Sequence, residues 1–413
     1  MKFCMAQESI VYIGDFDLRN ENVQAHLVMN NGKIFNKLGY SVSFIGINRN
    51  CCSFEEISKL SSINIENGNY LELPYTLTTK GILLYAHVKR KILSFLDNVC
   101  ANQSIKYVIT YQAPTYAFIL KNIALWCKKE GIPYIVNCAD LPLFDSQSLV
   151  KGAVMKYNWN KMHNINKRYA KGVIAVSHCI AEFYKCENRP SIIIPPLFDE
   201  PELLAITAKE NDIPVFLYAG TPFIKSTHEI KTTGMKDRLD KIIDLMFDIE
   251  KRGILFQFDI VGIAKEDYRA CVPRHNEMLN QSRQIAFYGT QSHENTLKKL
   301  VDADYMINYR DKNLMTEAGM STKVVESVSV GTPVVMNDIG DTFLYLESGV
   351  SGIKLTGDFN KDVGLVSKLC LMNKVDRKRN KSASRSSKVF SIDKYVPVMQ
   401  SFIESVNSFS KTL

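Results

Sequence analysis

Residues 305–340, YMINYRDKNLMTEAGMSTKVVESVSVGTPVVMNDIG, decide the fold. The stretch opens with an apolar run at 305–308 and ends soon after a second apolar run at 334–336. A Gly-Thr-Pro turn at 331–333 introduces the second run, and an amphipathic segment begins near Ser321. Short apolar runs separated by a helix indicate two parallel strands with a crossover helix, which is the repeating unit of α/β proteins.

The start of this helix carries a pattern that suits a nucleotide sugar. Lys323 and Glu326 are three residues apart, so their side chains share a helix face. A cation beside the free N–H groups of a helix start favours a diphosphate. A carboxylate one turn further in can accept hydrogen bonds from two sugar hydroxyls. The same two residues also fit an ordinary solvated pair on a surface helix, and this stretch alone leaves both alternatives open.

Length and composition describe a globular protein of two domains. The chain has 413 residues, of which 46% are apolar and 23% charged. No run of about 18 apolar residues is present, and Glu8 interrupts the apolar start that a signal peptide needs. The ten cysteines are scattered, without metal-ligand spacing. The sequence therefore predicts a cytoplasmic protein without a metal site.

The net charge is concentrated in the first half. Residues 1–195 carry 22 Lys and Arg against 14 Asp and Glu, whereas residues 196–413 carry 29 of each kind. A basic half can attract anionic lipid, phosphorylated substrates or nucleic acid. Because the basic residues are dispersed without interleaved aromatic residues, nucleic acid is not expected as a partner.

One basic segment suggests a membrane surface. Residues 85–96, YAHVKRKILSFL, place Lys89, Arg90 and Lys91 among apolar side chains. Such a helix can lie on an anionic bilayer, which predicts a peripheral location on the inner face of the membrane. An ordinary core-packing helix with a charged outer face fits the same pattern. A second basic run at 377–381, followed by serines, reads as a solvated helix end or, alternatively, as a membrane contact.

Strands and helices alternate in the same way in both halves of the sequence. Strands are expected at 10–14, 42–46, 107–111, 134–137, 173–176 and 192–194, and then at 215–219, 256–261, 285–288, 305–308 and 334–336. Helices are expected at 22–38, 82–96, 115–130 and 155–169, and then at 237–251, 294–301, 322–330 and 361–371. This alternation predicts two doubly wound α/β domains.

Prolines mark the boundary between the predicted domains. Pro195 and Pro196 interrupt the rhythm, because proline breaks helices and sheets. We expect domains at 1–198 and 214–388 with a linker at 199–213. A C-terminal helix at 389–413 is expected to pack back on the first domain.

These motifs resemble those of glycosyltransferases with the GT-B fold, in particular the retaining group called family 4. The segment 321–335, STKVVESVSVGTPVV, is the strongest match, and the resemblance extends over nearly the whole chain. YAGTP at 218–222 with the following Lys236-Asp237, and FYG at 287–289, support it in order. The resemblance implies two Rossmann-like domains facing across a cleft, with the donor bound by the second domain and the acceptor by the first.

The chain departs from the family pattern at two places. The family often carries a second glutamate eight positions before the one matched by Glu326, but that position is Ala318, and Glu317 is one place off. The arginine that usually follows the glycine of the first strand of the second domain is absent, because Gly220 is followed by Thr221. We expect Arg310 or Lys225 to replace it.

Transfer from a nucleotide-diphosphate sugar requires stabilisation of the leaving diphosphate. We assign this role to Lys236 and Lys323, and the resemblance implies that Glu326 binds the donor ribose. The expected donor-binding residues are Gly220, Thr221, Gly319, Met320, Ser321, Thr322 and Glu326. In the first domain, Asp140 follows a predicted strand and either orients the acceptor or caps its loop.

The sequence thus predicts a hexosyltransferase that acts with retention on a glycan or lipid-linked sugar acceptor, in surface polysaccharide or glycoconjugate synthesis. The resemblance implies that no cofactor or metal is needed. Asp302 and Asp304 have the spacing of a metal-binding pair, but they read as a turn at a helix end. Two alternatives remain: a nucleotide-sugar epimerase of the same fold, and a catalytically silent protein that binds the donor.

Overall fold

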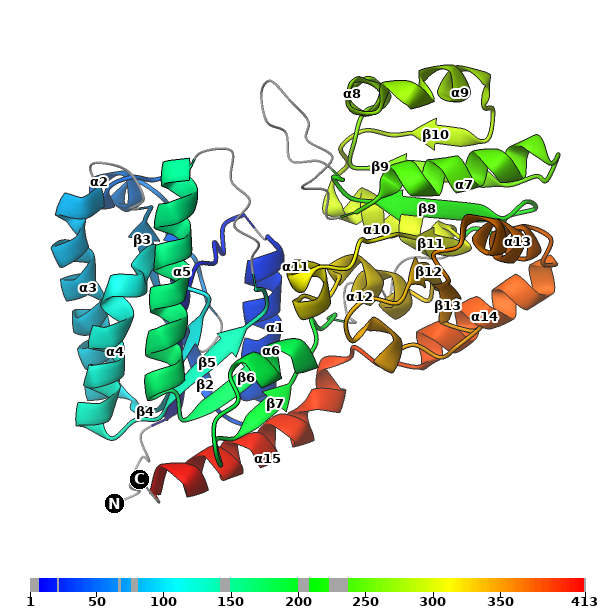
Figure 1. The fold of residues 1–413 in the computed structure, drawn as a ribbon. Helices are drawn as coiled ribbons and strands as arrows, with labels where there is room; N and C mark the ends of the chain where they lie inside the picture. The colour runs from blue at the N-terminus through cyan, green and yellow to red at the C-terminus, as the bar shows by residue number, and fades with distance from the viewer. Residues whose placement is uncertain are drawn as a thin grey trace. The chain divides into compact units, whose positions relative to one another are not determined.

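The computed structural model describes residues 7–20, 22–65, 68–75, 81–141, 149–199, 208–222 and 237–411. The chain forms two compact units, which Figure 1 colours along the sequence. Unit 1 comprises Met1–Leu197 and Ile392–Leu413, and unit 2 comprises Phe198–Ser391. Each unit has its own parallel sheet with helices on both faces, so the predicted α/β class with two doubly wound units is confirmed.

Unit 1 is built on a sheet in which neighbouring described strands run parallel. Its strands are β1 (Glu8–Gly14), β2 (Ser41–Asn48), β3 (Tyr70–Pro74), β4 (Ser104–Tyr111), β5 (Tyr134–Cys138), β6 (Gly172–Ala175) and β7 (Ser191–Ile193), in the order β3-β2-β1-β4-β5-β6-β7. Its helices are α1 (Val23–Lys37), α2 (Phe54–Ser58), α3 (Gly81–Asn102), η1 (Pro114–Tyr116), α4 (Ala117–Glu130), α5 (Leu149–Tyr169), α6 (His178–Phe183) and α15 (Ile392–Lys411). The helices α3, α4 and α5 lie together on one face, and α1 packs beside α15 on the other (Figure 1).

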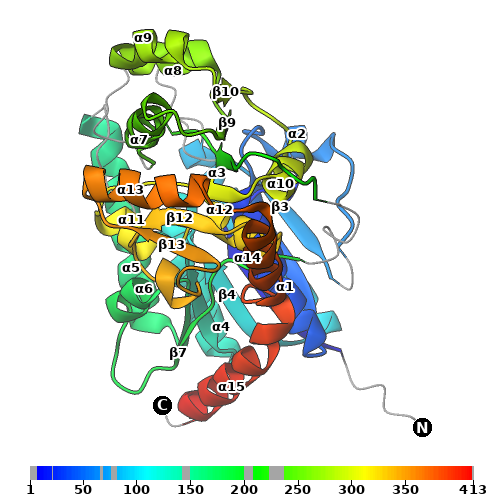
Figure 2. The ribbon, with the colours of Figure 1, turned by 90° about the vertical axis from the view of Figure 1, so that its right-hand side faces the viewer.

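Unit 2 repeats this plan with six described strands. They are β8 (Val215–Ala219), β9 (Gln257–Val261), β10 (Ile285–Phe287), β11 (Tyr305–Ile307), β12 (Val334–Asn337) and β13 (Gly352–Leu355), in the order β10-β9-β8-β11-β12-β13. The helices are α7 (Leu239–Lys251), α8 (Lys265–Cys271), η4 (Pro273–His275), α9 (Asn276–Gln281), α10 (His293–Asp302), α11 (Leu314–Ala318), α12 (Thr322–Ser329), η5 (Thr342–Leu344), α13 (Phe359–Cys370) and α14 (Lys374–Ser386). Figures 1 and 2 both show α8 and α9 beside β10 at one edge of this sheet.

Side-chain alternation along β8 joins the two layers of unit 2. Phe216 and Tyr218 pack with α7 and α13 on one face of the sheet. Leu217 and Ala219 pack with α10 and α12 on the other face. Because β8 is covered on both faces, it reads as a continuous apolar run in the sequence.

Helix α3 uses its apolar face for the core of unit 1. Val88, Ile92 and Leu96 are fully buried, whereas Arg90 and Lys91 are exposed. The helix is therefore a core-packing helix with a charged outer face. Val88, Ile92 and Leu96 are thus not available to enter a bilayer.

Helix α14 was not predicted. The run at 377–381 was interpreted as a helix end followed by a serine-rich bridge, but the helix continues through the serines to Ser386. Arg377 is buried, and its guanidinium donates to the carbonyl oxygens of Met372 at 2.7 Å and Asn211 at 2.6 Å. For Arg377, the solvated and membrane-bound interpretations are both wrong, because the side chain holds unit 2 together.

We expect Ile92→Ala to lower the free energy of unfolding by about 2–5 kcal/mol, because it leaves a cavity in the core. Arg90→Ala, two residues away on the exposed face, should change it by less than about 0.5 kcal/mol. Urea unfolding followed by circular dichroism measures both. Equal effects of the two substitutions would contradict the packing of α3.

Candidate active site

In unit 2, the carboxyl ends of β8 and β11 meet at the point where the strand order reverses. The two strands are neighbours, although the chain leaves them toward opposite edges of the sheet. Such switch points are the usual ligand sites of open parallel sheets. Gly220 follows β8 directly, and Asn308, Tyr309 and Arg310 follow β11.

The polar side chains of this switch point bind to the carboxylate of Asp237. Asp237 is 2% exposed and lies just before α7. Its Oδ1 accepts from Arg310 Nε at 2.8 Å and from Asn308 Nδ2 at 3.4 Å. Its Oδ2 accepts from the Tyr218 hydroxyl at 3.0 Å and pairs with Lys323 Nζ. Two cations therefore share one buried carboxylate.

The charge of Asp237 is maintained by these partners. Burial alone would raise the pKa of the Asp237 carboxyl. The charges of Lys323 and Arg310, with the hydrogen bonds from Lys323 and Tyr218, outweigh burial and hold the pKa below its ordinary value. The cluster thus contains an ionised carboxylate between two cations and has a net positive charge.

Gly220 makes room for Lys323. Its φ of +149° lies in a region that side chains rarely adopt, and a Cβ there would come within 2.1 Å of Lys323 Nζ. The ammonium of Lys323 also lies 5.0 Å from the centroid of the Tyr218 ring. The glycine that ends β8 therefore allows the lysine of α12 to reach the switch point.

Helix α12 presents an open start beside this cluster. Ser321 is its N-cap residue, but its hydroxyl makes no capping hydrogen bond and is buried without a partner among the described residues. Thr322 is the first residue of the helix. The first N–H groups of a helix have no partner within the helix, so they suit an anion.

Three of the predicted donor-binding residues make other contacts in the structure. The N–H of Gly319 donates to the carbonyl of Met315 at 3.1 Å and closes α11, so it is already used. Met320 packs against the core on the α12 side of the sheet. Thr221 is exposed, and its hydroxyl donates to the carbonyl of Gly262 at 3.3 Å.

The two glutamates of this region differ in position. Glu326 is half-buried one turn inside α12. Glu317 lies in α11 with one carboxylate oxygen buried and without a partner in the described structure. Ala318, at the family's second glutamate position, is fully buried.

Asp302 and Asp304 have structural partners. Asp302 accepts from the backbone N–H of Lys209 at 2.9 Å, and Asp304 from that of Val215 at 2.9 Å. Asp304 also pairs with Arg377 at 3.2 Å. Both precede β11, at the edge of the sheet opposite the Asp237 cluster.

Unit 1 has a switch point of its own between β1 and β4. Asp15 follows β1, is 8% exposed, and accepts from the Thr115 hydroxyl at 2.6 Å. Its other carboxylate oxygen is buried without a partner among the described residues. Burial raises the pKa of Asp15 to about 7, although the hydrogen bonds from Thr115 and the charge of Arg49 act against it. Asp15 therefore titrates near neutral pH.

Asp140 follows β5 at the same edge of the unit 1 sheet. Its carbonyl oxygen accepts from Gln112 Nε2 at 2.9 Å, and Gln112 follows β4 with a φ of +24°. The backbone of Asp140 is thus tied to the end of the neighbouring strand.

The structure brings Lys323 and Arg310 to one carboxylate and places Gly220 against Lys323. Lys236 and Lys225 lie outside the described residues. No role was predicted from the sequence for Asp237 or Asp15. An acidic residue directly after a buried strand was the available signal for Asp15, and the Lys-Asp pair beside the family motif was the signal for Asp237.

Two features are absent from the described residues. No helix is both long and apolar enough to span a membrane. No group of three or more His, Cys, Asp and Glu side chains lies together as a metal ion would require.

No model of a protein family matches the sequence, and neither does any curated protein. Solved structures do match the fold. A sucrose-phosphate synthase from Thermosynechococcus elongatus has a TM-score of 0.66 at 13% identity, over 97% of this chain and 99% of its own.

Two further structures are similar over the same length. HepE from Anabaena, in complex with UDP, has a TM-score of 0.63 at 13% identity, covering 96% of this chain and 100% of its own. The catalytic domain of starch synthase IV from Arabidopsis thaliana, bound to ADP and acarbose, has a TM-score of 0.63 at 10% identity, covering 98% of this chain and 100% of its own. The chain has the fold of these proteins. The predicted GT-B fold is confirmed.

The two buried aspartates should affect stability with opposite signs. The pKa of Asp15 is raised in the folded state, so the native protein loses stability as pH rises from about 4 to about 7, and Asp15→Asn should gain stability over that window. The pKa of Asp237 is lowered, so its contribution is present above about pH 4 and lost below it. At neutral pH, Asp237→Asn should lower the free energy of unfolding by about 3–5 kcal/mol, because Lys323 and Arg310 lose their shared anion.

Urea unfolding of both variants and the unchanged protein across this pH range measures the effect. If the difference in stability between Asp15→Asn and the wild-type protein does not change between about pH 4 and about pH 7, Asp15 does not have a raised pKa in the folded state.

Proposed function

We propose that this protein is a glycosyltransferase that moves a hexosyl residue from a nucleotide-diphosphate sugar to a glycan or lipid-linked acceptor. The observation that carries the proposal is the positively charged Asp237 cluster beside the open start of α12, at the switch point of unit 2. The likeness in fold to HepE with UDP and to starch synthase IV with ADP supports a nucleotide donor.

The leaving diphosphate gains negative charge as the sugar departs. Lys323 can move from Asp237 to a phosphate oxygen, because its ammonium is held there by charge and by the space over Gly220. Arg310 remains on Asp237 and keeps the local charge positive. The N–H groups at Ser321 and Thr322 add fixed dipoles, and each such contact stabilises the transition state by about 2–4 kcal/mol.

The nucleoside is expected to lie further along α12. Glu326 is one turn from the proposed diphosphate site, and a carboxylate can accept from both ribose hydroxyls. Lys236 also serves the diphosphate in this proposal, as the sequence motif implies.

In this proposal the acceptor binds to unit 1. Asp15 follows β1 and Asp140 follows β5, and only β4 lies between these two strands in the sheet. Asp140 orients an acceptor hydroxyl. A lipid-linked acceptor would place the reaction in surface polysaccharide or glycoconjugate synthesis. The proposed reaction needs no metal or other cofactor, so transfer should continue in the presence of a chelator.

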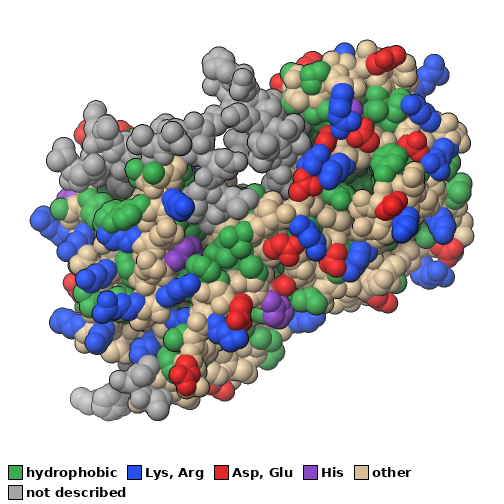
Figure 3. Space-filling model, in the orientation of Figure 1, with side chains coloured by type: hydrophobic (Ala, Val, Ile, Leu, Met, Phe, Trp, Pro, Cys, Tyr) green, Lys and Arg blue, Asp and Glu red, His purple; other side chains and the backbone are tan. Residues whose placement is uncertain are grey.

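A peripheral association with anionic membranes is also part of the proposal. Figure 3 shows Lys and Arg side chains gathered over the part of unit 1 that carries α3, α4 and α5. Since the apolar face of α3 is in the core, this helix contributes only its exposed charges, such as Arg90 and Lys91. Each is worth roughly 1 kcal/mol near an anionic surface.

The donor site is tested by Lys323→Ala and Glu326→Ala. Thermal-shift screening with UDP, GDP, ADP and their sugars identifies the donor, since a ligand at about 100 times its Kd adds about 2.7 kcal/mol. With that donor, Lys323→Ala should lower kcat/KM by an amount that corresponds to about 2–4 kcal/mol of lost transition-state stabilisation. Glu326→Ala should mainly abolish the thermal shift.

The exposed Lys368→Ala in α13 serves as the matched control and should behave as the unchanged protein. If Lys323→Ala keeps activity within about twofold of the control, less than about 0.4 kcal/mol, the assigned site is wrong. Conversion of the sugar nucleotide without any acceptor would instead indicate an epimerase.

We expect transfer with retention of the anomeric configuration. The basis is the resemblance of segment 321–335 to the retaining family. Proton NMR of the first-formed product gives its anomeric coupling before mutarotation. A product inverted relative to the donor would reject retention without rejecting the donor site.

Membrane association should depend on charge. Co-sedimentation with anionic vesicles is expected to fall as salt rises, because the contact is screened. Reversal of Lys89, Arg90 and Lys91 to glutamate should weaken it further. Equal binding to neutral vesicles, or none at low salt, would remove this part of the proposal.

A further inference from the structure

A cavity of about 450 Å³ lies at the amino ends of β5 and β6, on the edge of the unit 1 sheet opposite Asp15 and Asp140. The ends of α4 and α5, the loop before β7 and Phe409 of α15 surround it. Five cations line it: Lys128, Lys167, Arg168, Lys171 and Arg189. No described residue of its lining is acidic.

The cations of this cavity lack anionic partners. In the described structure, none of the five takes part in an ion pair with a carboxylate. Arg189 donates to the carbonyl of Lys167 at 2.8 Å and to that of Tyr184, which fixes its guanidinium in place. Like charges held this close repel one another unless an anion joins them.

Two of the five cations, Arg189 and to a lesser extent Lys167, are also partly removed from water, whereas Lys128 and Arg168 are exposed. Burial, and then the charge of Arg189, lowers the pKa of Lys167. Burial lowers the pKa of Arg189 as well. Lys167 lies 3.6 Å from the centroid of the Phe183 ring, and Lys171 lies 5.7 Å from that of Phe409. Aromatic faces hold these ammonium groups where carboxylates normally would.

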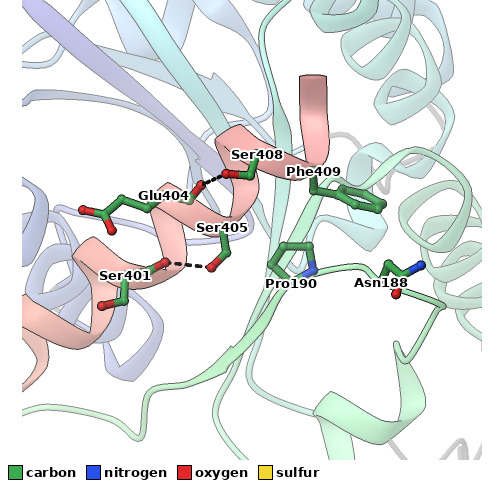
Figure 4. A pocket seen from close by; sticks show the side chains of 7 residues that line it. All are labelled: Asn188, Pro190, Ser401, Glu404, Ser405, Ser408 and Phe409. Carbon is green, nitrogen blue, oxygen red and sulfur yellow. Dashed lines mark hydrogen bonds between the residues drawn. The ribbon is translucent and has the colours of Figure 1, made fainter. Parts of the chain in front are cut away.

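A neighbouring cavity provides a contrast. It measures about 580 Å³ and shares Phe409, but serines of α15 and Glu404 line it (Figure 4). The hydroxyls of Ser405 and Ser408 already donate to carbonyl oxygens one turn earlier, at 2.9 and 3.0 Å. Among the described residues, no cation lines that cavity, and its one carboxylate, Glu404, accepts from Gln400 Nε2 at 3.3 Å.

We propose that the five-cation cavity of unit 1 is a binding site for a phosphoryl group with at least two negative charges. Phosphate oxygens are the natural acceptors for lysine and arginine at this density. The volume is in the range of small-molecule sites and exceeds what one phosphate fills. The group can belong to a free phosphorylated molecule or to the head group of a lipid, whose chain would contact Leu125, Ile132 and Phe409.

The chain provides a local reporter for this site. Its two tryptophans, Trp126 in α4 and Trp159 in α5, both belong to unit 1. The Trp126 indole donates to Asp97 of α3 at 2.8 Å. The Trp159 ring lies 5.5 Å from that of His163, which lies 4.9 Å from the Phe183 ring that holds Lys167. The fluorescence of Trp159 should therefore respond to this cavity rather than to the donor site of unit 2.

The test titrates tryptophan fluorescence at about 0.15 M salt with inorganic pyrophosphate and, separately, with monomeric dihexanoyl phosphatidic acid. In Lys167→Ala/Lys171→Ala, the Kd should rise at least tenfold. The matched control Lys59→Ala/Lys394→Ala removes the same charge from exposed positions of the same unit, outside the cavity, and should stay within twofold. Circular dichroism confirms that both variants are folded.

Tighter binding of pyrophosphate assigns the site to a free phosphorylated molecule, and tighter binding of the short-chain lipid assigns it to a head group. No saturable response to either probe overturns the proposal, as does an equal loss in the two double variants. Lys323→Ala should leave the response unchanged. The result is therefore independent of whether unit 2 binds a nucleotide sugar.

Discussion

The buried carboxylate of Asp237 is the constraint on which unit 2 depends. An ionised group that is only 2% exposed is costly unless charges and hydrogen bonds compensate it. Its partners come from three separate places: Tyr218 from β8, Asn308 and Arg310 from the end of β11, and Lys323 from α12. The carboxylate therefore fixes the positions of these elements relative to one another, at the point where the strand order reverses.

This arrangement also explains why the open start of α12 is not neutralised. The cluster has one more positive than negative charge, and the first turn of α12 contains no acidic residue. Gly220 contributes by the absence of a side chain, because any Cβ there would occupy the place of Lys323. The site is thus prepared electrostatically by residues that are themselves held rigidly, which is how preorganised sites stabilise developing charge.

The sequence allowed the buried strands and α12 to be predicted, since strands covered on both faces read as apolar runs. Of the four edge strands, β7 and β10 were predicted as short apolar runs, but β3 and β13 were not. β3 and β13 lie at sheet edges and carry polar residues such as Glu72 and Lys354, so they lack that signal. α14 was missed because its buried face is made of Arg377, Asn380 and Ser384 rather than apolar residues. The role of Asp237 depends on partners distant in sequence, and no local pattern contains that information.

The return of the chain from unit 2 to unit 1 has a consequence for biosynthesis. Phe402 and Val406 of α15 are buried, and both would contact a side chain placed at Gly172 in β6. The core of unit 1 therefore includes residues that leave the ribosome after all of unit 2 has been made. Domains usually fold in order of synthesis. Here the second unit, which is contiguous in sequence, can complete its fold while the first still lacks a helix. The growing chain therefore has to keep the α15 face of the unit 1 sheet protected until α15 has been synthesised.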